Sequence, residues 1–385
     1  MTKRLSAQIE FLKCADRLKS VNRANFLLNQ SRPENAAEHS WQLALWALVM
    51  QPLASEQVNI NRVIRMLLLH DLVEIIVGDH PIHLQTGWQA VERSEKAAAA
   101  ELFGLLPDDQ ASECLALWQE FESDETPDAK FAKYLDRCQP MFQVLCAPNS
   151  MEEHCKIVRE NLNTGRAAYL KTEFPLAFDA ARSLLEGIPL APNPFSDRLP
   201  FLTESDALKS VYRASRLLND ERFENSAEHS WHIMLYAWIL SEHAFPEVSI
   251  DRVLKMLLLH DVVEIDAGDH PIHGQVDHAA QEAEEKAAAK RLFGLLPDDQ
   301  NAEFHDLWRE FEAAESPDAQ FAKAIDRFQA PVGNLETGGG SWKDYNVTYA
   351  QIEQRVGTPV QRGAPGLWAW LQPQLDNYFA TAANI

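Results

Sequence analysis

The sequence predicts an all-α protein built from two tandem copies of one domain, and three observations lead to this prediction. The chain has 385 residues, which is more than one hydrophobic core usually serves. Long segments recur at a constant offset of 190 residues. Apolar residues in each copy follow a helical period, and runs of alternating β-branched residues are missing. We therefore expect two helical bundles, each with roughly six or seven helices.

The repeated unit is a whole domain. The run HDLVEI that begins at His70 returns as HDVVEI at His260, and LFGLLPDDQ is repeated without change. Solenoid repeats have periods of roughly 20 to 50 residues, so an offset of 190 indicates a duplicated domain. We expect the first copy at residues 1–186, a Pro-rich linker at 187–200 and the second copy at 201–385.

Several helices of each copy can be placed in order. Residues 34–50 carry apolar side chains at spacings of three and four, and residues 61–77 are apolar nearly all round, as in a buried central helix. The segments EKAAAAELFGLL and CLALWQEFE consist of strong helix formers. The sequences TPD at 126–128 and SPD at 316–318 combine a hydroxyl N-cap with Pro at the first helical position, so a helix should begin at each.

The composition of the chain limits which binding partners and which cellular location we expect. The formal net charge of -22 would repel a polynucleotide and an anionic membrane surface, and no cluster of basic residues offsets it. No apolar run is long enough for a spanning helix, and the N-terminus lacks the pattern of a signal peptide. The five cysteines show no CxxC pair or regular spacing. We therefore expect a cytoplasmic protein with neither polynucleotide nor membrane partners.

Two histidines and two aspartates recur at matching positions in the copies. They are His39, His70, Asp71 and Asp136, repeated as His229, His260, Asp261 and Asp326. The adjacent His-Asp lies in an apolar run, where charged residues are rarely buried unless they are paired or bind a metal. Imidazole and carboxylate together suit a divalent first-row ion. A single buried histidine is more often a core residue, but a whole set kept in both copies, while neighbouring positions changed, favours one metal site per copy.

Two further carboxylates accompany each predicted metal site. Glu74 and Glu264 follow the histidine of the His-Asp pair by four residues, and on one helix they would share its face. Asp79 and Asp269 each follow a glycine that we expect to end that helix. Each pair can serve as general base and general acid beside an ion that lowers the pKa of water. A glutamate at this spacing is, however, also common on exposed helix faces.

Arginines and a histidine-rich segment also recur near the predicted sites. Arg23 and Arg213 precede the first histidine of each set, and a guanidinium there can either clamp a phosphate or form a surface salt bridge. The two GDHPIH segments hold His80, His83, His270 and His273. These histidines can bind a second metal, contact a phosphate or simply belong to a polar loop. Glycine-rich phosphate loops, GxSxG and HExxH are absent, which excludes ATP-driven, serine-hydrolase and zincin chemistry.

The ordered motifs H, HD and D, with HDxxE and a following GD, resemble those of the HD-domain metal-dependent phosphohydrolases, in particular the small 5'-deoxynucleotidases. The resemblance covers most of both copies and implies two tandem HD-domain helical bundles. It implies an enzyme of the phosphomonoesterase type with one divalent ion per copy, whether Co, Mn, Mg, Zn, Ni or Fe. It assigns the eight recurring histidines and aspartates as metal ligands, Glu74, Asp79, Glu264 and Asp269 as catalytic, and Arg23 and Arg213 as substrate-binding.

The resemblance also implies a reaction, the hydrolysis of (deoxy)nucleoside 5'-monophosphates to nucleoside and phosphate. The alternatives are hydrolysis of nucleoside di- or triphosphates or alarmones, and a nucleotide-sensing module without turnover. Members of this branch generally have one domain and form dimers, so the fused copies predict an intramolecular pseudo-dimer. Both copies depart from the family with His-Pro-Ile-His after GD, which leaves the specificity of this loop open.

Overall fold

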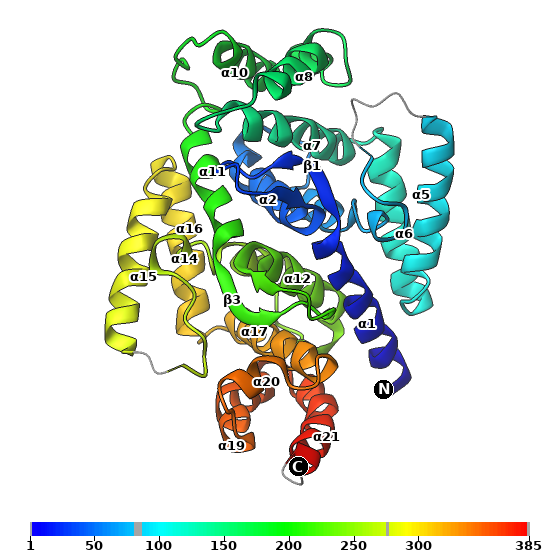
Figure 1. The fold of residues 1–385 in the computed structure, drawn as a ribbon, viewed down its shortest axis with the longest axis vertical. Helices are drawn as coiled ribbons and strands as arrows, with labels where there is room; N and C mark the ends of the chain where they lie inside the picture. The colour runs from blue at the N-terminus through cyan, green and yellow to red at the C-terminus, as the bar shows by residue number, and fades with distance from the viewer. Residues whose placement is uncertain (1, 81–86, 275–276, 383–385) are drawn as a thin grey trace. The chain divides into compact units, whose positions relative to one another are not determined.

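The computed structural model describes residues 2–80, 87–274 and 277–382 and confirms the all-α class with two domains (Figure 1). Contacts group the chain into two compact units. The first-copy unit consists of Leu18–Ala207 and Leu292–Asn301, and the second-copy unit consists of Met1–Arg17, Leu208–Arg291 and Ala302–Ile385. Each unit thus combines the core of one copy with segments of the other. The boundaries expected from the sequence, 1–186, 187–200 and 201–385, stay predictions.

The elements of the first copy and of the segment that follows it are these: β1 Asn22–Phe26, β2 Pro33–Asn35, α2 Ala36–Val49, α3 Ile60–Leu69, α4 Glu74–Val77, α5 Trp88–Phe103, α6 Asp108–Ser123, α7 Pro127–Leu145, α8 Glu152–Asn163, α9 Leu170–Glu173, α10 Pro175–Leu185 and α11 Leu199–Ser205. The helices α2, α3 and α7 pack against one another, and α6 packs against α3, α5 and α7. These contacts make α2, α3 and α7 the centre of the first-copy unit.

The remaining elements are α1 Thr2–Ala15, β3 Tyr212–Arg216, β4 Phe223–Asn225, α12 Ser226–Ile239, α13 Ile250–Leu259, α14 Glu264–Ala267, α15 His278–Phe293, α16 Asp298–Ala313, α17 Pro317–Glu336, α18 Gly340–Asp344, α19 Tyr349–Ile352, α20 Thr358–Gly363 and α21 Pro365–Ala382. In the second-copy unit α12, α13 and α17 pack together as their counterparts do in the first. Several helices, such as α4 and α9, have only four residues, which raises the number above the six or seven expected per copy. In the described part of the chain, no helix is both long and apolar enough to cross a bilayer.

The central helix α2 is buried along its whole length. All of its side chains from Ala36 to Val49 are buried, the polar ones of its first two turns included, so the helix expected at 34–50 is confirmed. A capping box fixes its start: the Asn35 side chain accepts from the Glu38 N–H at 3.0 Å, and the Glu38 carboxylate accepts from the Asn35 N–H at 2.9 Å. Because both partners are buried, the cap sets where the following histidine enters the core.

The helix starts predicted at the TPD and SPD sequences are confirmed. The Thr126 hydroxyl accepts from the Ala129 N–H at 3.2 Å, and α7 begins at Pro127. Ser316 makes the same bond at the start of α17. The caps fix the register of the two helices that carry Asp136 and Asp326.

The single helix expected over residues 61–77 is wrong, because the chain leaves the α-helical pattern at the His-Asp pair. Helix α3 ends at Leu69, and α4 begins at Glu74. Between them the bonds tighten to a spacing of three, as from the Glu74 N–H to the Asp71 carbonyl at 2.9 Å. The glycine expected to end the helix is confirmed, since Gly78 caps α4 with φ +77.

Each copy also contains a short antiparallel hairpin that the sequence analysis did not anticipate. In the first copy β1 pairs with β2, with Asn22 opposite Asn35 and Phe26 opposite Pro33. The pair β3 and β4 repeats this register in the second copy. The strands lack alternating β-branched residues, and β1 carries Arg23 to the end of α2 where the first histidine lies.

The N-terminal helix α1 is held in the second-copy unit by buried hydrogen bonds. The His232 Nε2 donates to the Leu12 carbonyl at 2.9 Å. The Asp16 carboxylate accepts from the Leu218 N–H at 2.9 Å, and Phe11 is fully buried. The N-terminal segment of the first copy therefore belongs to the hydrophobic core of the second-copy unit.

The corresponding segment of the second copy completes the first-copy unit. The Asp206 carboxylate accepts from the Leu28 N–H at 2.8 Å. Phe195, which is fully buried, lies with its ring centre 5.0 Å from that of Phe142 and 6.1 Å from that of Trp46. The copies thus exchange their N-terminal segments.

This exchange predicts that the two halves stay together after the chain is cut. A protease recognition sequence inserted after the exposed Gly187 lets the fragments 1–187 and 188–385 be produced from the folded protein. They should co-elute in size-exclusion chromatography, because each unit buries segments of both fragments. The same cut in urea is the control and should release separate fragments. Separate elution from the native, cleaved sample would contradict the exchange.

Candidate active site

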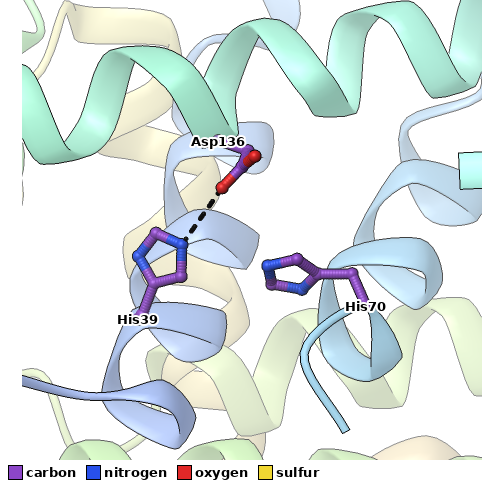
Figure 2. Close-up of side chains that lie close together, drawn as sticks. All are labelled: His39, His70 and Asp136. Atoms are coloured by element: carbon purple, nitrogen blue, oxygen red, sulfur yellow. Dashed lines mark hydrogen bonds and ion pairs between the residues drawn. The ribbon is translucent and has the colours of Figure 1, made fainter. Parts of the chain in front are cut away.

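Three helical segments bring the predicted metal ligands of the first copy together (Figure 2). His39 comes from α2, His70 from the end of α3, and Asp136 from α7. The His39 Nε2 lies 3.3 Å from Asp136 Oδ1, and the His70 Nε2 lies 3.0 Å from Asp71 Oδ1. One donor atom from each of His39, His70 and Asp136 lies within 4.8 Å of the other two. We name this group with Asp71 the first centre.

The second copy repeats this arrangement. The His229 Nε2 lies 3.1 Å from Asp326 Oδ1, and the His260 Nε2 lies 2.9 Å from Asp261 Oδ1. Donor atoms of His229, His260 and Asp261 lie within 4.8 Å of one another. These four residues form the second centre. All eight side chains named from the sequence therefore fall into two clusters of four.

In His70 and His260 a backbone bond at Nδ1 leaves Nε2 as the ring nitrogen that faces the cluster. The His70 Nδ1 donates to the Leu67 carbonyl at 2.9 Å, and the His260 Nδ1 donates to the Leu257 carbonyl at 2.8 Å. Both Nε2 atoms are buried, and their partner in each cluster is the adjacent aspartate, at 3.0 Å for Asp71 and 2.9 Å for Asp261. Imidazole nitrogens and carboxylate oxygens converging from separate helices are a donor set that fits a divalent first-row ion.

The electrostatic environment of the first centre favours a positive charge. Burial acts to lower the pKa of His70, but the carboxylates of Asp71 and Asp136 raise it above its ordinary value. Burial acts to raise the pKa of Asp71, but the charges of His70 and Arg23 outweigh it and lower the pKa to about 2. Burial is likewise outweighed at Asp136, where Arg137 and the bond to His39 hold the pKa well below its usual range.

The two arginines at matching positions lie beside the clusters with side chains only 15% exposed, which excludes an exposed surface salt bridge. The Arg23 Nη1 donates to Asp71 Oδ2 at 2.8 Å and lies 4.0 Å from Asp79 Oδ1. In the second copy the Arg213 Nη1 lies 2.9 Å from Asp261 Oδ2 and 3.8 Å from Asp269 Oδ1. Each guanidinium thus joins a carboxylate of its centre to the aspartate that follows the glycine turn.

Glu74 and Asp79 complete the first centre from the two ends of α4. Burial and the charge of Asp71 raise the pKa of Glu74 well above its usual range. Burial also raises the pKa of Asp79, although Arg23 acts against it. In the second copy Glu264 accepts a hydrogen bond from the Ser226 hydroxyl at 2.5 Å, a partner that the first copy lacks because Ala36 stands there.

A buried amide behind the first histidine was missed by the sequence reasoning. The His39 Nδ1 donates to Gln139 Oε1 at 3.0 Å, and Gln139 Nε2 donates to Gln42 Oε1 at 2.7 Å. In both copies this Nδ1 also lies 3.6 Å from a glutamate oxygen, that of Glu34 in the first and Glu224 in the second. The repeat itself held a signal, because the glutamine follows the aspartate by three residues in both DRCQ and DRFQ.

The histidines of the GDHPIH segments do not form a second cluster in the described part of the chain. His80 Nδ1 donates to the Gly78 carbonyl at 3.0 Å, and His83 lies outside the described residues. His270 and His273 line the cavity of the second copy without a group of three ligands. Burial and the charge of Arg355 lower the pKa of His273 to about 4.

Each centre opens into a cavity. The first has a volume of about 360 Å³ and is lined by Arg23, Asp79 and Asp136 among others. The second has a volume of about 170 Å³, and its lining includes Arg213 and Asp326. Each cavity therefore has a polar end with the carboxylates and the guanidinium, and space beside it for a small molecule.

Both copies match one protein family. Residues 15–177 and 205–368 each match the model of the HD domain. Two vertebrate proteins named 5'-deoxynucleotidase HDDC2 are similar to the chain: that of Xenopus laevis is 36% identical over 138 residues, and that of Homo sapiens is 33% identical over 136 residues. The matches cover 36% and 35% of this chain. They span about two thirds of these relatives, 67% and 65% of their lengths.

A bacterial relative and a solved structure are also similar. The 5'-deoxynucleotidase PM0747 of Pasteurella multocida is 30% identical over 189 residues, which cover 46% of this chain and 82% of that protein. A crystal structure of a predicted metal-dependent phosphohydrolase from Magnetospirillum magnetotacticum is 44% identical, with a TM-score of 0.47. It covers 49% of this chain and 96% of that one.

The two clusters predict two separable metal sites per chain. After loading with Mn²⁺ or Co²⁺ and gel filtration, the unmodified protein should hold two equivalents, because each cluster supplies a complete set of nitrogen and oxygen donors. His39→Ala and His229→Ala should each retain one equivalent, and the double variant none. Metal content is measured by mass spectrometry of the digested protein. His278→Ala, an exposed histidine at the start of α15, is the matched control. Two equivalents in His39→Ala would contradict the assignment.

Proposed function

Because the chain belongs to the HD-domain family of metal-dependent phosphohydrolases, we propose that both copies hydrolyse (deoxy)nucleoside 5'-monophosphates to nucleoside and phosphate. One observation carries the proposal: in each copy the complete set of histidines and aspartates meets a largely enclosed arginine and two further carboxylates beside a cavity. The names of the curated relatives support the monophosphate substrate.

We assign one divalent ion to each centre, held by His39, His70, Asp71 and Asp136 in the first and by their counterparts in the second. The ring nitrogens of the histidines, which meet the aspartate oxygens at 2.9–3.3 Å, support this assignment. When bound, the ion supplies positive charge that stabilises phosphoryl oxygens and lowers the pKa of nearby water. Its identity among Co, Mn, Mg, Zn, Ni and Fe is a matter for the metal-loading experiment.

Arg23 is placed to bind the phosphate of the substrate. Its Nη1 is occupied by Asp71, but a guanidinium has five N–H donors in a fork that matches phosphate oxygens. Pairing with Asp71 also fixes the side chain before substrate arrives, which reduces the entropy lost on binding. Arg213 has the same partner and the same role in the second copy.

Glu74 and Asp79 supply the proton transfers. Glu74 begins α4 and accepts the proton of the attacking water, while Asp79, just after the turn at Gly78, protonates the leaving 5'-oxygen. Burial and the neighbouring charge of Asp71 raise the pKa of both carboxyl groups. For Asp79 a raised pKa favours the protonated form that an acid needs, and for Glu74 it makes the ionised carboxylate a stronger base. Glu264 and Asp269 take these roles in the second copy.

The exchanged segments support a covalent pseudo-dimer. Each unit buries an N-terminal segment from the other copy, so neither copy is complete by itself. Buried bonds such as that from His232 to the Leu12 carbonyl hold the segment in place. We infer that the fusion keeps two complementary copies in one chain at a fixed ratio.

Phosphate release from a panel of deoxynucleoside monophosphates tests the function. With Co²⁺, Mn²⁺, Mg²⁺ or Zn²⁺ present, the unmodified chain should release phosphate from monophosphates. Asp71→Ala and Asp261→Ala should each lose one centre and keep the other, since the ligand sets are separate, and the double variant should fall to background. Turnover of triphosphates with no release from any monophosphate would overturn the proposal.

The role of Glu74 is tested in a chain with one working centre. In the Asp261→Ala background, Glu74→Gln should lower kcat by about 10²- to 10⁴-fold, because the general base is lost while size and metal ligands are kept. Bound metal, measured in the same preparation, should not change. Glu56→Gln, at an exposed position, is the matched control. An unchanged kcat for Glu74→Gln would show that this carboxylate takes no part in proton transfer.

A further inference from the structure

The two copies agree where they form the centres and diverge immediately afterwards. Helix α7 continues from Asp136-Arg137 with CQPMFQVL, whereas α17 continues from Asp326-Arg327 with FQAPVGNL. The diverged halves of both helices line the cavities beside the centres. The lining residues at the centres are thus shared between the copies, and those that follow along α7 and α17 are not.

Outside the centre, the lining of the first cavity includes a group of apolar side chains. Helix α7 contributes Met141 and Val144, and α8 contributes Ile157 and Val158. Three of these four side chains are buried, and Ile157 is partly exposed. From α8, His154 packs its ring against that of Phe26, with centres 6.3 Å apart. The lining also includes Asn25, Glu153 and Asn161, so a base in this cavity meets hydrocarbon together with polar side chains that are partly or fully exposed to solvent.

The far wall of the second cavity is polar and aromatic. After α17 the chain turns through three glycines with positive φ, Gly338 to Gly340, into α18. This turn places Ser341, Trp342 and Tyr345 in the cavity wall together with Asn334. Tyr345 is 40% exposed, and Trp342 is nearly fully buried.

The Ser341 hydroxyl is fixed in one orientation. The Asn334 Oδ1 accepts from the Ser341 N–H at 3.0 Å and from its Oγ at 3.2 Å. The neighbouring Trp342 ring anchors α18 on α21, with its centre 5.2 Å from that of Tyr378. Because the hydroxyl proton points to Asn334, the oxygen lone pairs of Ser341 remain to accept a hydrogen bond.

The two kinds of cavity wall differ in how well they distinguish one nucleobase from another. An apolar pocket separates similar ligands only weakly, whereas a site built around a hydrogen bond rejects an analogue that leaves its polar group unpaired. Among nucleobases, the exocyclic amino group of cytosine, adenine or guanine donates to an acceptor such as the Ser341 oxygen. The carbonyl at the same position of uracil or thymine cannot.

We propose that the two centres select different nucleosides: the first is permissive, and the second prefers bases with an exocyclic amino group, which it recognises through Ser341. The proposal rests on the monophosphatase function proposed above. It makes Ser341 a specificity-determining residue, since it lies in the cavity wall and holds neither metal nor phosphate. One chain would then combine a general activity with a selective one.

Single-centre chains and the matched substrates dCMP and dUMP test this proposal, because the two nucleotides differ only in an amino group against a carbonyl at C4 and in the hydrogen that uracil carries at N3. In Asp71→Ala, which keeps the second centre, kcat/KM should be about 10-fold higher for dCMP. In Asp261→Ala, which keeps the first centre, the two values should agree within about 3-fold. Equal ratios in both chains, with phosphate released, would overturn the proposal and leave the function standing. No release from any monophosphate would instead overturn the function.

A second variant isolates the hydroxyl. In the Asp71→Ala background, Ser341→Ala should bring the ratio for dCMP over dUMP close to one by lowering kcat/KM for dCMP, with dUMP turnover kept. Ser112→Ala, on the exposed face of α6, is the matched control and should leave the ratio unchanged. A ratio that survives Ser341→Ala would remove this residue from recognition. If Ser341→Ala does not fold, the comparison of the two single-centre chains still decides the proposal.

Discussion

Buried negative charge at each centre is the constraint on which the rest of the fold depends. Asp71 and Asp136 lie among apolar helices, where an uncompensated carboxylate costs several kcal/mol, of order 3–5. Arg23, at 2.8 Å from Asp71, and the two histidines supply part of the compensation, and a divalent ion suits the remainder. Only side chains held rigidly by three packed helices can keep such charges at fixed distances, which explains why α2 is buried along its entire length.

The break in the helix at the His-Asp pair solves a geometric problem. Neighbouring residues of a continuous α-helix point in directions about 100° apart, so His70 and Asp71 would not both face one centre. The tightened turn after Leu69 brings the His70 Nε2 within 3.0 Å of Asp71 Oδ1. It also starts a new short helix at Glu74, whose end at Gly78 delivers Asp79 to Arg23.

Duplication leaves one part of each domain constrained and another free to change. The charged residues of the two centres are identical in the copies. Replacing one of them would leave its partner as an unpaired buried charge, which strongly destabilises a fold. Positions one layer away differ: Ser226 bonds Glu264 where the first copy has Ala36, and His232 stands where it has Gln42. The cavity walls differ most, since they affect only which ligand fits.

The sequence by itself determined the helical class, the duplication, the capped helix starts and the membership of both clusters. The hydrophobic period and the N-cap residues are local features of the chain, and the cluster residues can be found by aligning the two copies with each other. It did not reveal the break after Leu69, the hairpins or Gln139 behind His39, since each depends on partners more than ten residues away or on competing tertiary contacts. Only the tertiary structure decided that the N-terminal segments are exchanged, because a helix such as α1 carries an apolar face without specifying which copy buries it.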